Sequence, residues 1–161
     1  MNKATKKTEN DNPSIITCYF RDGNIIEFDF PDDSHSYCAQ LGLSATQDGK
    51  YIFIPVWEGG LYCYETQTGN LVWIQRAGKI GRIIANKDKI FCARMDVGIE
   101  VRAVLNWDLI GKIPCTDVEM QFQRLDEEHF VYRNRTKKQG PFFKVRFDDL
   151  SQEIYQGQEL I

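Results

Sequence analysis

The chain has 161 residues, of which 42% are hydrophobic and 27% charged, and its formal net charge at pH 7 is −3. This balance excludes an intrinsically disordered chain and a protein that coats nucleic acid through bulk positive charge, and the length favours one domain. No apolar run approaches the roughly 18 residues that span a bilayer, and no apolar signal-peptide core is present, so we expect a cytoplasmic protein without a membrane partner.

The N-terminal end is polar. Residues 1–13 contain three lysines and no apolar run. We therefore predict a disordered N-terminal tail over residues 1–13, followed by a single folded domain over residues 14–161.

The rest of the chain reads as short strands without helical periodicity. Runs rich in Ile, Val, Phe and Tyr come in pairs, and each pair is separated by a turn that contains glycine. A β-hairpin needs such a turn, because glycine readily adopts positive φ angles. The predicted strand pairs are Ser14–Phe20 with Ile25–Phe30, Tyr51–Trp57 with Leu61–Glu65, Lys89–Arg94 with Ile99–Leu105, and His129–Arg133 with Phe142–Phe147.

The hairpins recur at a nearly constant spacing. Their turn glycines are Gly23, Gly60, Gly98 and Gly140, which are 37, 38 and 42 residues apart. A polar turn and a further strand follow each hairpin. A period of about 40 residues is typical of propeller blades, which have four strands each.

The segment from Gly59 to Trp73 resembles one blade of the PQQ-like, quinoprotein-type β-propeller repeats. The resemblance is best over residues 50–76. It implies an all-β fold, namely a small or partial β-propeller of about four antiparallel four-stranded blades. It implies no activity, and we expect no cofactor. The sequence leaves open whether the chain closes into a ring, remains an open stack or forms a half-ring that dimerises.

The five cysteines give no sign of a disulfide framework or a metal site. Their number is odd, their spacings are wide and no CxxC motif is present. We interpret them as reduced, buried thiols and predict no metal ligands.

Catalytic motifs are also absent from the sequence. The two histidines, His35 and His129, are far apart, and the carboxylates cluster at Asp32–Asp33, 126–128 and Asp148–Asp149, where turns are expected. Solvated turns explain these clusters best, so we predict no catalytic residues and no enzyme. The alternative is a propeller-type hydrolase or lyase whose central channel brings the histidines and acids together.

The C-terminal hairpin over residues 133–146 is basic and aromatic. We select as candidate partner-binding residues Arg133, Arg135, Lys137, Lys138, Phe142 and Lys144. A solvated hairpin whose lysines protect an exposed strand edge explains these residues most simply. If the surface is used for binding, we expect a protein partner. Phosphate contacts combined with stacking would also suit a single-stranded nucleic acid, which remains the alternative.

The sequence therefore predicts a non-enzymatic protein that binds another macromolecule, and we expect that macromolecule to be a protein. Propeller loops form broad rims, and loops commonly carry recognition. A homodimer is one form of this prediction. A more specific hypothesis is a bacterial immunity protein that neutralises a basic nuclease toxin, because an acidic chain would associate quickly with a basic partner.

Overall fold

A computed structural model of the chain describes residues 3–7, 14–19, 23, 25–30, 43–56, 60–76, 80–94, 97–115, 122–133 and 140–156. Within these residues the structure is entirely β. No helix in the described part of the chain is long and apolar enough to cross a membrane.

The strands form four antiparallel sheets, which we call the first to fourth blades. The first blade contains β1 (Lys3–Lys7), β2 (Ser14–Tyr19) and β3 (Ile25–Phe30). The second contains β4 (Ser44–Ala45), β5 (Tyr51–Val56), β6 (Gly60–Glu65) and β7 (Leu71–Gln75). The third contains β8 (Ile80–Ala85), β9 (Lys89–Arg94), β10 (Gly98–Ala103) and β11 (Leu109–Ile113). The fourth contains β12 (Gln123–Arg124), β13 (His129–Arg133), β14 (Phe142–Arg146) and β15 (Gln152–Tyr155).

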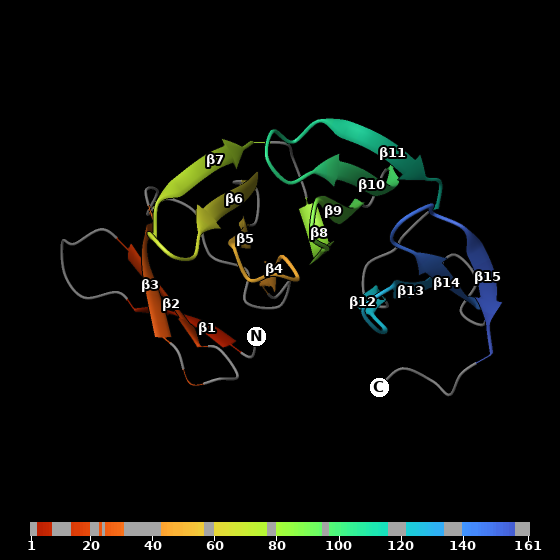
Figure 1. Cartoon of the computed structure of the whole chain (residues 1–161), viewed down its shortest axis with the longest axis horizontal. Helices are drawn as coiled ribbons and strands as arrows, with labels where there is room; N and C mark the ends of the chain where they lie inside the picture. Colours follow the sequence, from red (N-terminus) through yellow and green to blue (C-terminus); the bar gives the residue numbers. More distant parts are fainter. Residues whose placement is uncertain are drawn as a thin grey trace.

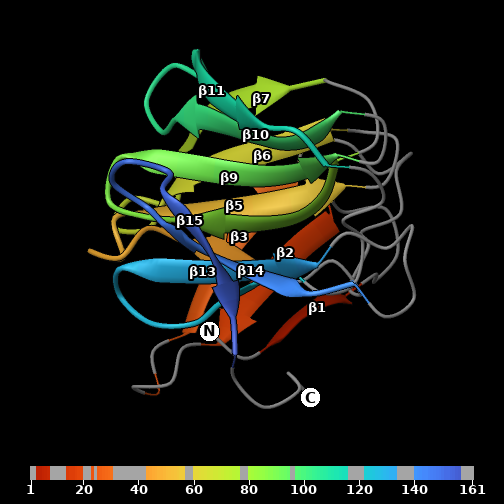
Figure 2. The ribbon, with the colours of Figure 1, turned by 90° about the vertical axis from the view of Figure 1, so that its right-hand side faces the viewer.

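The blades follow one another in chain order along an open arc, with the first and fourth at its two ends (Figure 1). In the second to fourth blades the strands run in sequence order from the inside of the arc to the outside. The hairpin turns before β5, β9 and β13, and those before β7, β11 and β15, lie at one edge of the arc, which we call the turn rim (Figure 2). The predicted partial β-propeller of about four blades is therefore confirmed.

The first blade differs from the prediction at its inner edge. Residues 1–13 are predicted to be a disordered tail, whereas Lys3–Lys7 form β1 and pair with β2 in a register that runs from Lys3 opposite Tyr19 to Lys7 opposite Ile15. Backbone hydrogen bonds along an open strand edge do not require apolar side chains, so a polar segment can occupy it. The described residues supply three strands to this blade, and residues 31–42 lie outside them.

Apolar side chains fill the spaces between neighbouring blades. In β9, Ile90 and Cys92 belong to the cluster shared with the second blade, whereas Phe91 and Ala93 belong to the cluster shared with the fourth. Alternate residues of a strand point to opposite faces of the sheet, so one strand contributes to two cores. A third cluster joins Ile26 of the first blade to the second blade. The fold is thus a stack of sheets that cover one another.

Two glycines define the repeat at the level of the backbone. Gly60 and Gly98 begin the third strand of their blades with φ angles of 102° and 100°. A Cβ atom on Gly98 would lie 2.5 Å from the carbonyl oxygen of Ile113, and one on Gly60 would collide with the carbonyl oxygen of Gln75. The outer strand can therefore approach closely only where the side chain is absent.

We predict that Gly98→Ala lowers the free energy of unfolding by more than about 2 kcal/mol, because it adds a steric clash to the cost of a positive φ angle. The matched control is Gly49→Ala, where φ is also positive, at 70°, but no atom lies within 4 Å of the added Cβ. The control should cost only about 1 kcal/mol. Urea denaturation measures the free energy of unfolding of both variants. Equal losses of stability would show that the close approach of the outer strand does not explain the glycine at position 98.

A buried carboxylate organises the third blade. The side chain of Glu100 is 4% exposed, and its Oε2 lies 2.9 Å from Arg102 Nη2 and 3.4 Å from Arg94 Nη1. Lys112 Nζ lies 3.9 Å from the other oxygen, Oε1. A buried carboxylate is tolerated only when cations or hydrogen-bond donors surround it, as they do here.

Glu100→Gln should lower the free energy of unfolding by about 3 kcal/mol, because the partly buried guanidinium groups of Arg94 and Arg102 lose the counter-charge of the buried carboxylate. The comparison variant is Glu153→Gln. Its 69% exposed side chain pairs with Lys144 at 3.3 Å. Loss of such an exposed pair costs less than about 1 kcal/mol. Thermal and urea denaturation measure the free energy of unfolding of both variants. Similar losses of stability for the two would refute the structural role of Glu100.

The described cysteines are free thiols: Cys63 and Cys92 are buried and Cys115 is half-buried. This matches the interpretation as reduced thiols at these three positions, whereas the side chain of Cys18 and all of Cys38 lie outside the described residues. Burial raises the pKa of Cys63 to about 12 and that of Cys115 to about 11. Burial also raises the pKa of Cys92.

These pKa values predict slow alkylation of the folded protein, because only the thiolate reacts. At pH 8, iodoacetamide should modify Cys63 at least about 100-fold more slowly in the folded chain than in the urea-unfolded chain. Peptide mass spectrometry reads each cysteine separately. Similar rates at Cys63 in the two states would show that the thiol is not protected by burial.

Candidate protein-binding face of the fourth blade

The fourth blade presents two different faces. Phe130 and Tyr132 of β13 and Val145 of β14 pack into the cluster shared with the third blade. Strand alternation therefore places Arg133 and Lys144 on the opposite face, which we call the end face. The fourth blade ends the arc, so among the described strands no further sheet lies against the end face (Figure 1).

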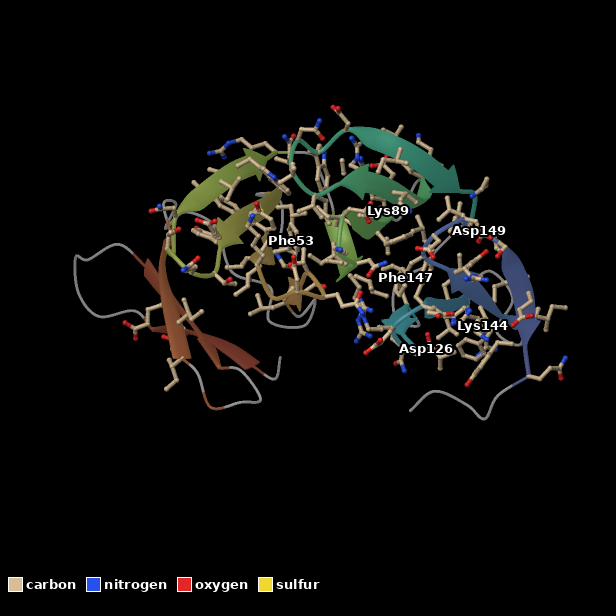
Figure 3. The ribbon with its side chains drawn as sticks, viewed as in Figure 1. Phe53, Lys89, Asp126, Lys144, Phe147 and Asp149 are labelled. Atoms are coloured by element: carbon tan, nitrogen blue, oxygen red, sulfur yellow. The ribbon has the colours of Figure 1, made fainter. Side chains whose placement is uncertain are left out.

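The strand register brings three of the predicted partner-binding residues together on the end face. Arg133 lies opposite Phe142 across the β13–β14 pair, and Lys144 lies opposite Val131 on the same face. The Arg133 guanidinium lies 5.2 Å from the centre of the Phe142 ring, within the range of a cation–π contact. Figure 3 shows Lys144 on this blade, with Asp126 and Asp149 near its turns. The arrangement combines positive charge with an aromatic surface.

The charges of the end face are partly compensated. Lys144 Nζ lies 3.3 Å from Glu153 Oε1 on β15. Together with His129 and Arg146, these residues line a hollow of about 340 Å³. A hollow bordered by three basic side chains and one carboxylate can accept a polar group from a partner, and it favours one that carries negative charge.

His129 is held by its own turn. Its Nδ1 lies 2.9 Å from Asp126 Oδ1, and the same carboxylate oxygen accepts hydrogen bonds from the backbone amides of Glu128 and His129. Partial desolvation acts to raise the pKa of Asp126, but the hydrogen bonds from Glu128 and His129 outweigh it and leave that pKa below its usual value. This geometry stabilises the β12–β13 turn.

The other predicted site residues divide into two groups. The carboxylates at 126–128 and Asp148–Asp149 lie in exposed turns, as the sequence predicts. Outside the described residues lie Arg135, Lys137, Lys138, His35 and Asp32–Asp33. In the part of the chain that the structure describes, no three His, Cys, Asp or Glu side chains converge as metal ligands.

The sequence prediction missed several members of the end face. Arg146 and Glu153 border the hollow, and Tyr155 pairs with Phe142. The period of two along β13 and β14 is the signal that identifies Arg146, since it lies two positions beyond Lys144. Glu153 and Tyr155 require the β14–β15 register, which the sequence does not supply.

Comparison with known proteins supports the fold. No family model matches the chain, and no curated protein matches its sequence. Solved structures do match: BamB from Moraxella catarrhalis has a TM-score of 0.62 at 12% identity, and the WD40 repeats of RRP9 have 0.61 at 14%. U3-55K has 0.60 at 14% identity. The fold is that of a β-propeller.

The matches cover nearly all of this chain but only part of each propeller. They include 94%, 96% and 98% of the chain, against 47%, 54% and 50% of the three structures. The chain thus spans about half the length of these propellers, in agreement with the open arc of blades. Identities of 12–14% establish the fold alone.

Proposed function

We propose that the chain is a non-enzymatic scaffold that binds another protein through the end face of its fourth blade. The observation that carries this proposal is the placement of Arg133, Phe142 and Lys144 on one face at the end of the arc. Arginine and aromatic residues are enriched in protein interfaces, where they supply most of the binding energy. The excess of basic groups favours a partner surface that carries carboxylates.

The architecture supports the same proposal. Among the described strands, the second and third blades have a neighbouring sheet on both faces, whereas the fourth has one on a single face, although Val131 on the end face is itself buried. A sheet at the end of a stack gains stability when another surface covers its free face. A binding partner is one way to provide that cover, in addition to any direct recognition by the charged groups.

A second copy of the chain is one such partner. At the other end of the arc, Ile26 packs against the second blade, so its neighbours Ile25 and Glu27 lie on the opposite, outward side. Ile25 is 60% exposed. Two half-rings could place Glu27 of one copy near Arg133 of the other at each junction. In such a homodimer the two half-rings would together form a closed ring. Its mass in solution would be about twice the 18.7 kDa of one chain.

A bacterial immunity protein is a separate functional proposal, which does not use the end face. The net charge of −3 and the isoelectric point near 5.4 favour association with a basic protein such as a nuclease toxin. A basic toxin would be repelled by the basic groups of the end face, so in this form the contact lies on a more acidic part of the chain. The free thiols at Cys63, Cys92 and Cys115 support the cytoplasmic location that both forms assume.

The test compares co-purification and affinity for charge-neutralised variants. A partner retained by the wild-type chain from its native cell is identified, purified and titrated against each variant. Arg133→Gln combined with Lys144→Gln should weaken binding at least about tenfold, since each charged contact in an interface contributes on the order of 1 kcal/mol or more. Lys112→Gln is the matched control, because Lys112 is a basic residue of the third blade with a 47% exposed side chain.

Three outcomes would contradict the end-face proposal. The first is equal affinity for the double variant and the control. The second is no partner at all together with a monomeric mass in solution. The third is binding of single-stranded RNA at low salt that the double variant and Lys137→Glu with Lys138→Glu abolish, which would establish the nucleic-acid alternative instead.

A further inference from the structure

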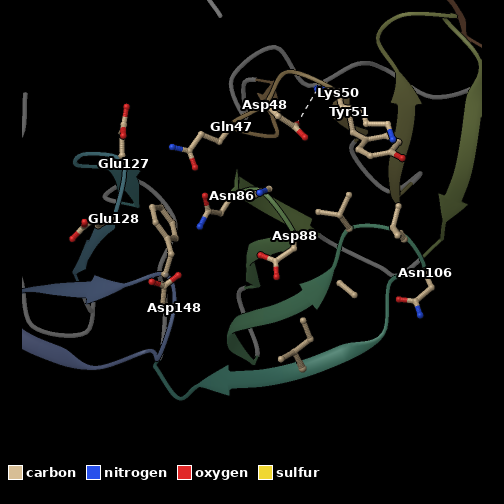
Figure 4. Close-up of a pocket in the computed structure, with 16 residues that line it drawn as sticks. Gln47, Asp48, Lys50, Tyr51, Asn86, Asp88, Asn106, Glu127, Glu128 and Asp148 are labelled. Carbon is tan, nitrogen blue, oxygen red and sulfur yellow. Dashed lines mark hydrogen bonds between the residues drawn. The ribbon is translucent and has the colours of Figure 1, made fainter.

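A groove of about 960 Å³ lies at the turn rim, where the second, third and fourth blades meet (Figure 4). Its walls are the turns before β5, β9 and β13 and the turns before β11 and β15. The end face of the fourth blade lies elsewhere, and the groove shares neither Arg133 nor Lys144 with it. Its volume is at the upper end of the range for ligand pockets, roughly 300–1,000 Å³.

Asn86 occupies the middle of this groove. The residue is 8% exposed, and its side chain extends from the β8–β9 turn toward the space between Gln47 and Glu128 (Figure 4). Among the described residues its Oδ1 has no hydrogen-bond partner, although its backbone amide donates to the carbonyl of Lys89 at 2.8 Å. A buried amide oxygen without a partner is costly in a folded protein, so it identifies a position at which a donor from outside would be stabilised.

The charge around Asn86 indicates which kind of donor would bind. Five carboxylates line the groove together with two lysines, and the carboxylates are Asp48, Asp88, Glu127, Glu128 and Asp148. Within the described residues, no hydrogen bond or ion pair engages the side-chain carboxylates of Asp88, Glu128 or Asp148. The groove therefore holds unused negative charge beside an unused acceptor.

The basic groups near the groove do not supply that missing donor. Lys89 Nζ donates to the backbone carbonyls of Phe147 and Asp148, at 3.2 and 3.0 Å, and so ties the third blade to the fourth. Arg124 donates to the carbonyl of Ala85 and stacks on the Phe147 ring at 4.7 Å. Neither of these cations lines the groove, and both tie the third blade to the fourth beside it. The lysines that do line it, Lys50 and Lys87, make no hydrogen bond to Asn86 Oδ1 within the described residues.

We propose that the groove binds an arginine side chain presented by a basic segment of a partner protein. A guanidinium group has five N–H donors in one plane, so it can bond to Asn86 Oδ1 and to neighbouring carboxylates together. The exposed side chains of Leu105 and Ile110 border the groove and can contact the aliphatic part of arginine. No three acidic side chains of the described residues converge as metal ligands, so the spaced carboxylates suit an extended cation.

The direct test is an NMR titration of the ¹⁵N-labelled full chain with a capped tripeptide that has a central arginine. Signals of the Asn86 side-chain amide and of the backbone amides near Asp88 should shift in a saturable way. The matched peptide contains citrulline, which has the same shape without the charge, and should bind at least about tenfold more weakly. Raising the salt concentration should weaken binding of the arginine peptide, because salt screens the exposed carboxylates.

Substitutions locate the contact. Asn86→Leu should lower the affinity for the arginine peptide at least about tenfold, because it removes the hydrogen-bond acceptor. Asn86→Leu alters a buried position and can affect folding, so a second variant changes exposed positions only. This variant, Asp88→Asn combined with Glu128→Gln, should lower the affinity by a similar factor. Glu65→Gln is the control and should bind like the wild type, because this carboxylate of the second blade lies outside the groove and an amide oxygen can still accept the hydrogen bond from Thr68 Oγ1.

The proposal is overturned if the arginine and citrulline peptides bind alike. It is also overturned if the shifts lie outside the groove, or if the Asp88 and Glu128 double variant binds as tightly as the control. Tighter saturation of the same signals by spermidine would assign the groove to a free polyamine rather than to a protein. None of these results depends on the end face. The groove proposal can therefore fail while the end-face proposal stands, and the end-face proposal can fail while the groove proposal stands.

Discussion

Contact between neighbouring sheets is the interaction on which this structure depends. The strands of the third blade point Ile90 and Cys92 toward the second blade and Phe91 and Ala93 toward the fourth. A single blade would leave both apolar faces in water, whereas each added neighbour removes one face from solvent. Among the described strands, the blades at the two ends of the arc have such a neighbour on one side.

The repeat preserves backbone geometry where it does not preserve sequence. Gly69, Trp107 and Leu150 occupy equivalent turns with φ angles of 70°, 64° and 61°, and each donates its amide to the carbonyl four residues earlier. Glycine adopts this conformation freely, but tryptophan does so at a cost of about 1 kcal/mol. Trp107 recovers that cost through contacts, because its ring lies 5.3 Å from that of Trp73 and 4.9 Å from the Arg102 guanidinium.

The hairpins could be predicted from the sequence because their signals are local. Alternating apolar residues around glycine turns identify the central strand pairs, and the same alternation places Arg133 and Lys144 on one face. β1 could not be predicted, because pairing along an open strand edge leaves no apolar pattern. Asn86 could not be predicted either. In the sequence it is an ordinary turn residue, and its burial depends on the packing of the blades around the β8–β9 turn, where Arg124 of the fourth blade donates to the carbonyl of Ala85.

The acidic residues of the turn rim serve two separate purposes. Asp48, Asp126 and Asp149 accept hydrogen bonds from backbone amides within their own turns, at 3.1, 2.8 and 2.9 Å. Turn formation explains these three, and the same bonds help to keep the pKa values of the carboxyl groups low. Asp88 and Asp148 make no such bond in the described residues, yet both line the groove that contains the unpartnered side-chain oxygen of Asn86. Since turn geometry does not require these carboxylates, the proposed cationic ligand supplies a reason for their presence around the groove that the fold does not.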